Sequence, residues 1–113
     1  MRINTEYRKG IIFLRIKGYL DKKSYKELLD EVNNIIENFG ITNIVLNLDE
    51  ITKIDMKGIS SIYFIYEKLK KYKGSIYLCS NNNEVKSKLK KERLFKYINE
   101  IDSELKAFDL IKI

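Results

Sequence analysis

The chain of 113 residues contains no histidine, no proline and no tryptophan, and it has a single cysteine, Cys79. Without histidine, neither a Ser-His-Asp nor a Cys-His catalytic group can be assembled, and histidine-ligated metal sites are excluded. One cysteine cannot form an internal disulfide, and this usage is typical of the reducing cytoplasm, where we expect the protein to be located. Because proline is absent, the ends of helices and strands must be marked by glycine, asparagine and aspartate.

Long apolar runs are also missing. No segment approaches the roughly 18 apolar residues that a membrane-spanning helix needs. The first six residues lack the apolar stretch of a secretory signal. We therefore expect no membrane insertion. The remaining composition, 44% hydrophobic and 34% charged residues, is typical of a globular protein, and the length suits one domain over residues 1–113.

Positive charges outnumber negative charges in this sequence. Lysine and arginine number 22 against 16 acidic residues, for a formal net charge of +6. The two dense basic stretches, residues 68–73 and 86–93, fall toward the C-terminal ends of expected helices, where cations complement the helix dipole. Basic composition without a recognition motif is weak evidence for nucleic-acid binding, so we expect no nucleic-acid partner.

The first third of the chain predicts a β-hairpin followed by a helix. Residues 3–8 and 11–16 have strand character, and Lys9-Gly10 between them suits a tight hairpin turn. Apolar side chains then recur with the period of an amphipathic helix from Tyr25 to Phe39. Gly40 is a natural stop for this helix, and Ser24 or Asp21 can cap its start.

The later segments alternate between strand and helix patterns. In chain order we expect a strand over 44–48, a helix over 59–69 closed by Gly74, a strand over 75–79, a basic helix over 81–92, an edge strand over 95–101 and a last helix capped by Asp102 or Ser103. The inward side chains of the last helix are expected to be Leu105, Phe108 and either Leu110 or Ile111. The order ββαβαβαβα predicts an α/β domain with a mixed, mostly parallel central sheet and helices.

The segment from residue 48 to residue 61 combines a strand end, a short loop with Asp55 and a helix start. The first turn of a helix offers free backbone N–H groups and a positive dipole end, which together suit an anion. In this chain Lys57 occupies the position that would meet the anion. A positive side chain there is unfavourable for the helix dipole, and it opposes the usual use of such a site.

Four short segments carry a family resemblance. They read Gly-Tyr-Leu-Asp at 18–21, Ile-Val-Leu-Asn-Leu-Asp-Glu-Ile at 44–51, Asp-Met-Lys-Gly-Ile at 55–59 and Arg-Leu-Phe-Lys at 93–96. In order and spacing they resemble the Gly-Glu-Leu-Asp signature, the central strand, the Asp-Ser-Ser-Gly-Leu motif and the Gly-Leu-Phe-Lys stretch of STAS domains in bacterial anti-sigma factor antagonists of the SpoIIAA and RsbV type. The resemblance covers nearly the whole chain and implies a STAS-like fold.

That resemblance also implies a function in partner switching and transcription regulation. The partner of such antagonists is an anti-sigma factor that is also a serine kinase, and it phosphorylates the serine just before the motif's glycine. Phosphate then breaks the complex, because a docking surface cannot easily bury the added charge. The resemblance therefore implies a non-enzymatic protein-binding regulator, with an anti-sigma factor kinase or another signalling protein as its partner.

Carried over residue by residue, the motif matches only in part. Asp55, Gly58 and Ile59 take its aspartate, glycine and apolar positions, with Asp55 as a helix cap and Gly58 allowing close approach by a partner's backbone. Met56 and Lys57 replace both serines, and a lysine has no hydroxyl to phosphorylate. We therefore expect no phosphate control at Lys57. Ser60, one helical turn further on, is a less favoured substitute, since an ordinary helix hydroxyl is the commoner explanation.

The expected partner-binding surface comprises the loop from Thr52 to Lys57, the start of the following helix and the loop of residues 18–21. Its residues are Gly18, Asp21, Thr52, Asp55, Met56, Lys57, Gly58 and Ile59. A paired-carboxylate site at Asp21 and Asp55 is conceivable, but two cap or loop acids are the commoner explanation. No nucleophile–base pair, metal cluster or cofactor motif supports an enzyme, so we expect no catalytic residues, no metal and no cofactor.

The alternative function keeps the fold and changes the partner. STAS-like domains also serve as regulatory subunits of transporters and of larger signalling assemblies, and the missing serines raise this possibility. The sequence does not identify the partner or the oligomeric state.

Overall fold

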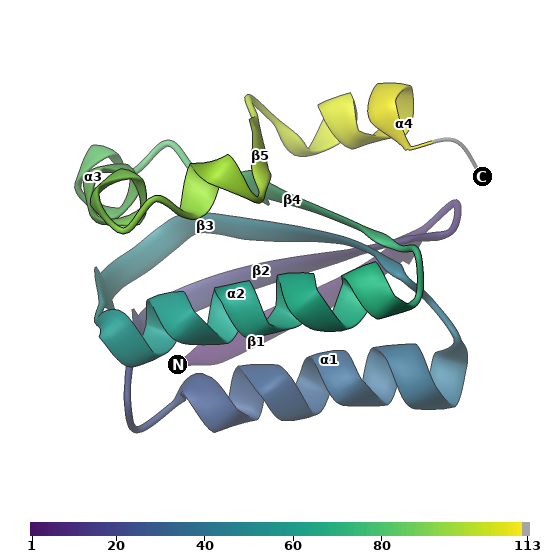
Figure 1. Ribbon diagram of the computed structural model, residues 1–113, viewed down its shortest axis with the longest axis horizontal. Coiled ribbons are helices and arrows are strands. Elements are labelled where there is room, and N and C mark those ends of the chain that lie inside the picture. The colour runs from purple at the N-terminus through teal and green to yellow at the C-terminus, as the bar shows by residue number, and fades with distance from the viewer. Residues whose placement is uncertain (112–113) are drawn as a thin grey trace.

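The computed structural model describes residues 1–111 as a five-stranded sheet with helices on both faces (Figure 1). The strands lie in the order β1-β2-β3-β4-β5. They are β1 (Arg2–Arg8), β2 (Ile11–Leu20), β3 (Asn43–Ile54), β4 (Ser75–Cys79) and β5 (Asn99–Ile101). The α-helices are α1 (Tyr25–Phe39), α2 (Met56–Lys71), α3 (Asn83–Lys91) and α4 (Ala107–Leu110), with short 3-10 helices at Leu94–Lys96 and Glu104–Lys106. The expected order of strands and α-helices is therefore confirmed.

The sheet is mixed, as the order of elements predicts. β1 and β2 form an antiparallel hairpin in which Arg2 lies opposite Lys17 and Arg8 opposite Ile11. Lys9 and Gly10 both have positive φ angles, of 50° and 85°, as two-residue hairpin turns require. The pairs β2–β3, β3–β4 and β4–β5 are parallel, because each connection between these strands passes through a helix.

Alternation along the strands divides the interior into two layers. The main core joins inward residues of β2 and β3, such as Leu14 and Leu46, to the apolar stripes of α1, α2 and α3. The second, smaller cluster lies on the opposite face, where Phe13 and Val45 pack with Ala107 and other residues near the C-terminus. Figure 1 shows α1 and α2 side by side across one face of the sheet. One core layer therefore lies on each face of the sheet.

β2 and β3 are longer than the sequence predicts. The expected strand over 44–48 extends through Ile54, and the expected strand over 11–16 extends through Leu20. Thr52 therefore lies in β3, not in a loop, and Gly18 lies in β2, not in a loop. β4 pairs with β3 only as far as Asn47, whereas β2 pairs with β3 as far as Ile54. The second half of β3 and the end of β2 thus form a two-stranded extension beyond β4.

The C-terminal region differs most from expectation. The edge strand predicted over 95–101 is a 3-10 turn at Leu94–Lys96 followed by the three-residue strand β5. The last helix is a 3-10 turn joined to a single α-helical turn, and Leu105, expected to face the core, is 66% exposed. Ile111 is buried instead, while Leu110 is exposed. Short elements carry too few periods for a pattern to fix their inward face.

Among residues 1–111, the structure has no helix that is both long enough and apolar enough to cross a lipid bilayer.

Candidate functional site

Asp55 organises the junction between β3 and α2. It is the N-cap of α2, and its Oδ1 accepts a hydrogen bond from the backbone N–H of Gly58 at 2.9 Å. Its Oδ2 accepts from the backbone N–H of Lys22, in the β2–α1 turn, at 3.0 Å. A single carboxylate thereby satisfies one free N–H of a helix start and ties a second loop to it. The expectation that Asp55 caps this helix is confirmed.

Asp21 performs a similar role in the β2–α1 turn. Its Oδ1 accepts from the backbone N–H groups of Lys23 and Ser24, and the Ser24 hydroxyl also lies 3.1 Å from it. Partial desolvation acts to raise the pKa of Asp21, but these hydrogen bonds outweigh it and lower the pKa below 3.8. Ser24 itself makes no side-chain cap bond to α1. Asp21 and Asp55 are therefore turn and cap acids whose oxygens face backbone N–H groups.

Gly58 makes the close packing of this junction possible. It is buried in the first turn of α2, and a Cβ atom at this position would lie 2.3 Å from the carbonyl oxygen of Leu20. The close approach that Gly58 permits is thus to the chain's own β2. The neighbouring Ile59 is also buried, at 5% exposure, in the main core. Both residues hold the start of α2 against the sheet extension.

Met56 and Lys57 are the exposed residues of the first turn of α2. The Met56 side chain is 55% exposed. The Nζ of Lys57 lies 5.5 Å from the centre of the Tyr25 ring at the start of α1, within the range of a cation–π contact. Ser60, one turn later, is exposed as well. The structure therefore presents residue 57 to solvent on a junction whose backbone is already ordered.

A groove adjoins this junction on the side of α3. It has a volume of about 370 Å³, and it is lined by Lys53, Ile54, Asp55, Met56, Ile59, Lys88, Lys91 and Glu92. The Nζ of Lys88 lies 3.4 Å from the carbonyl oxygen of Ile54, so α3 also touches the end of β3. The Lys53 ammonium lies 5.8 Å from the centre of the Tyr19 ring, which is 55% exposed.

Lys53 lies within the predicted loop from Thr52 to Lys57, but Lys88 and Lys91 were not expected near the junction. The stretch 86–93 was expected at the end of a helix as a complement to the dipole, which holds for α3 as well. Only the length of β3 and the packing of α3 beside it bring Lys88 and Lys91 to the groove that Met56 lines. The signal that could have indicated a longer strand is the pair Ile51 and Ile54, whose buried side chains continue the apolar residues of the expected strand over 44–48.

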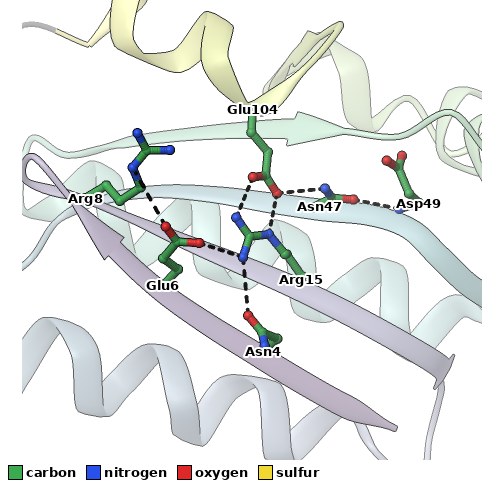
Figure 2. A network of polar contacts seen from close by, with 7 residues as sticks. All are labelled: Asn4, Glu6, Arg8, Arg15, Asn47, Asp49 and Glu104. Carbon is green, nitrogen blue, oxygen red and sulfur yellow. Dashed lines mark hydrogen bonds and ion pairs between the residues drawn. The ribbon is translucent and has the colours of Figure 1, made fainter.

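A second polar cluster lies on the opposite face of the sheet (Figure 2). Arg15 makes a two-point contact with Glu104, at 2.9 and 2.7 Å, and a second ion pair with Glu6 at 2.8 Å. The Asn47 amide donates to Glu104 at 2.8 Å. Hydrogen bonds from Arg15 hold the pKa of Glu104 below its ordinary value of 4.5, against partial desolvation. This cluster fastens the C-terminal segment to the sheet.

The side chains of Cys79 and Tyr63 have pKa values raised above their ordinary range. Burial raises the pKa of the Cys79 thiol to about 11, so it stays protonated at neutral pH and is a poor nucleophile. A hydrogen bond with Glu67 raises the pKa of Tyr63 to about 12. Across residues 1–111, no three acidic or cysteine side chains gather as metal ligands would.

Of the eight residues expected to bind a partner, the structure places all except Gly18 around the junction or on the end of β3 that leads to it. Gly18 lies further back on β2, opposite Ile51. Thr52, Met56 and Lys57 are exposed, Asp21 and Asp55 are partly buried, and Gly58 and Ile59 are buried. Their role in binding a partner stays a prediction.

The comparisons with known proteins identify the family and the fold. The family model described as the STAS domain matches residues 2–107. A crystal structure of a putative anti-sigma factor antagonist from Thermotoga maritima is similar, with a TM-score of 0.89 and 19% identity over 96% of this chain and 93% of that one. The phosphorylated form of the Bacillus cell fate determinant SpoIIAA gives a TM-score of 0.76 and 16% identity over 98% and 100%.

A sulfate transporter family protein from Wolinella succinogenes is also similar, with a TM-score of 0.76 and 16% identity over 91% of this chain and 85% of that one. At these identities the solved structures show a shared fold. The family model, in contrast, spans nearly all of the chain, including the β3–α2 junction. The chain belongs to the STAS domain family.

Proposed function

We propose that the protein is a non-enzymatic regulator of the anti-sigma factor antagonist type, which acts in the cytoplasm by binding a signalling protein through the β2–α1 turn and the β3–α2 junction. Its fold is shared with a putative antagonist from Thermotoga maritima and with SpoIIAA in its phosphorylated form. The junction itself supports a binding role, because Asp55 and Gly58 order its backbone in advance. An ordered surface loses less conformational entropy when a partner binds.

The proposal includes the absence of phosphate control at residue 57. The observation that carries it is the exposed Lys57 in the first turn of α2, where the family motif has its phospho-acceptor serine. A phosphoserine would bring about −1.5 to −2 charges to this turn, whereas Lys57 brings a permanent positive charge. Binding through this surface is then governed by the amounts of the two proteins and not by a kinase.

An affinity capture from the native cell tests this function. The tagged wild type and Lys57→Ser are used side by side, and captured proteins are identified by mass spectrometry. We expect the wild type to retain an anti-sigma factor with a serine-kinase domain. Retention of an unrelated class of protein by both forms contradicts the antagonist function.

Phosphate control is tested separately with the captured kinase and ATP. We expect no phosphate on the wild type and stoichiometric phosphate on Lys57→Ser, as measured by intact mass. Ser60→Ala in both backgrounds is the matched control, because Ser60 is the exposed hydroxyl one turn away. Stoichiometric phosphorylation of the wild type at any residue contradicts phosphate-independent binding.

A second candidate function is regulation of a transporter or another signalling assembly. The similarity to a sulfate transporter family protein favours it, and so does the replacement of both motif serines. A transporter recovered in the capture experiment, in place of a kinase, supports this function. A transporter gene beside that of this protein points the same way.

A further inference from the structure

Within residues 1–111, the lysines around the β3–α2 junction form no ion pair with an acidic side chain. Among residues 1–111, the ion pairs of the structure join Glu6, Glu37, Glu50, Glu100 and Glu104 to basic groups elsewhere, and they leave out Lys53, Lys57, Lys88 and Lys91. The Asp55 carboxylate at the junction accepts hydrogen bonds from backbone N–H groups at both of its oxygens.

The groove beside the junction adds apolar surface to this charge. Met56, which is 55% exposed, lines it together with Ile54 and Ile59, which are buried in the main core. Lys53 of β3 and Lys88 and Lys91 of α3 line the groove as well. Glu92 also lines it, so the groove carries three lysines against Asp55 and Glu92. Lys57 and Lys22 add two further exposed lysines around the same junction. A small apolar centre within a positive rim resembles the centre and rim of a protein interface.

From these contacts we infer that the docking surface extends onto α3 and receives an acidic, amphipathic segment of the partner, with an apolar side chain in the groove and carboxylates against Lys53, Lys88 and Lys91. This inference rests on the proposed function in taking the partner to be a protein. Charge complementarity selects an acidic partner. The groove's described lining is aliphatic, thioether or charged and suits an apolar side chain, whereas single-stranded nucleic acids bind mainly on aromatic rings, and the centre of the neighbouring Tyr19 ring already lies 5.8 Å from the Lys53 ammonium.

A synthetic 16-residue helical peptide provides the probe. It carries one central leucine with glutamates three and four positions to each side, and it is compared with a copy in which leucine is replaced by serine and a copy in which lysines replace the glutamates. Binding to the full chain is measured by fluorescence anisotropy at low and high salt, and the site is mapped by amide chemical-shift changes. We expect shifts at residues 53–59 and 85–92, weaker binding at high salt and weaker binding of both altered peptides.

Variants of the protein give the decisive comparison. Lys53→Glu with Lys88→Glu should weaken binding of the acidic peptide by about tenfold. Lys53→Gln with Lys88→Gln, which is milder for folding, should weaken it by about threefold. The matched control is Lys71→Glu with Lys106→Glu, which makes the same charge change at exposed lysines of other elements and should change binding by less than about twofold. Thermal unfolding checks that each variant is folded.

Several results overturn the inference. They are equal weakening by the control pair, chemical-shift changes centred outside the groove, and a labelled 20-nucleotide single strand that binds more tightly than the peptide and displaces it. Failure of the inference is distinguishable from failure of the proposed function. If the captured kinase binds the Lys53/Lys88 variants as well as it binds the wild type, the inference fails and the function stands. If the peptide behaves as expected but no signalling protein is captured, the function fails and the groove chemistry stands.

Discussion

The two polar regions of this domain use charge in opposite ways. Around Arg15, the guanidinium pairs with both Glu6 and Glu104, and the result is a clamp between β2 and the C-terminal segment. Around Asp55, the carboxylate faces backbone N–H groups, while the neighbouring lysines are exposed and form no ion pair within residues 1–111. The first arrangement stabilises the fold, and the second orders a surface while leaving its charge available. Substitutions that exchange these roles test the contrast.

The largest effect is expected from Gly58→Ala, which tests how tightly the junction is packed. Alanine is favoured over glycine within a helix, but its Cβ would lie 2.3 Å from the Leu20 carbonyl oxygen, so α2 must shift. We expect a loss of about 3 kcal/mol in the free energy of unfolding, measured by urea denaturation. Gly40→Ala is the control. Its Cβ meets nothing within 4 Å, and its positive φ costs only about 1 kcal/mol. Equal losses would show that the junction tolerates rearrangement.

The next effect concerns the cap. Asp55→Ala removes the acceptor for the N–H groups of Gly58 and Lys22, and we expect a loss of about 1.5 kcal/mol. Asp55→Asn keeps one good cap acceptor and should lose less than half as much. Urea denaturation gives both values. If the two variants are equally stable, the negative charge and not the cap geometry holds the junction.

Glu104→Gln tests the clamp, with an expected loss of about 1 kcal/mol at neutral pH. Because the pKa of Glu104 is lower in the folded chain than its ordinary 4.5, the carboxylate stabilises the fold above that value, and this contribution disappears as the pH falls through the folded pKa. The difference between wild type and variant should therefore be constant near neutrality and shrink below pH 4.5. Thermal unfolding from pH 3 to pH 7 measures it. A difference that grows toward low pH contradicts the clamp.

The smallest effect on stability is expected from Lys57→Ser. The contact with the Tyr25 ring and the unfavourable position beside the helix dipole oppose each other, so stability should change by less than about 0.5 kcal/mol. Thermal unfolding and capture of the partner are measured on the same samples. A loss of stability as large as that of Glu104→Gln would make Lys57 a structural residue and weaken the contrast between the two regions.

The sequence predicts the framework of this fold well where a pattern is long. The helical period of residues 25–39 and the stop at Gly40 correspond to α1. Its fifteen residues span about four helical turns, so the apolar pattern repeats often enough to identify the buried face. The cap role of Asp55 was also predictable, because a cap depends on residues only three positions apart.

What could not be predicted depends on contacts between distant segments. The second half of β3 is polar at Thr52 and Lys53 because that part of the sheet is only half covered, and a local pattern interprets it as a loop. The clamp joins Arg15 to Glu104 across 89 positions of sequence, and the groove needs α3 to lie beside β3. No local period or propensity carries that information.

Beyond β4, within residues 1–111, the outer edge of β3 has no neighbouring strand. Side chains from the α3 region contact two of the carbonyl groups on this edge. The Asn82 amide donates to the Ile51 carbonyl at 2.8 Å, and the Lys88 ammonium approaches the Ile54 carbonyl. An uncovered strand edge invites another copy to add a strand, the first step toward aggregation. By donating to the Ile51 carbonyl, Asn82 occupies an acceptor on this edge that a further strand would need.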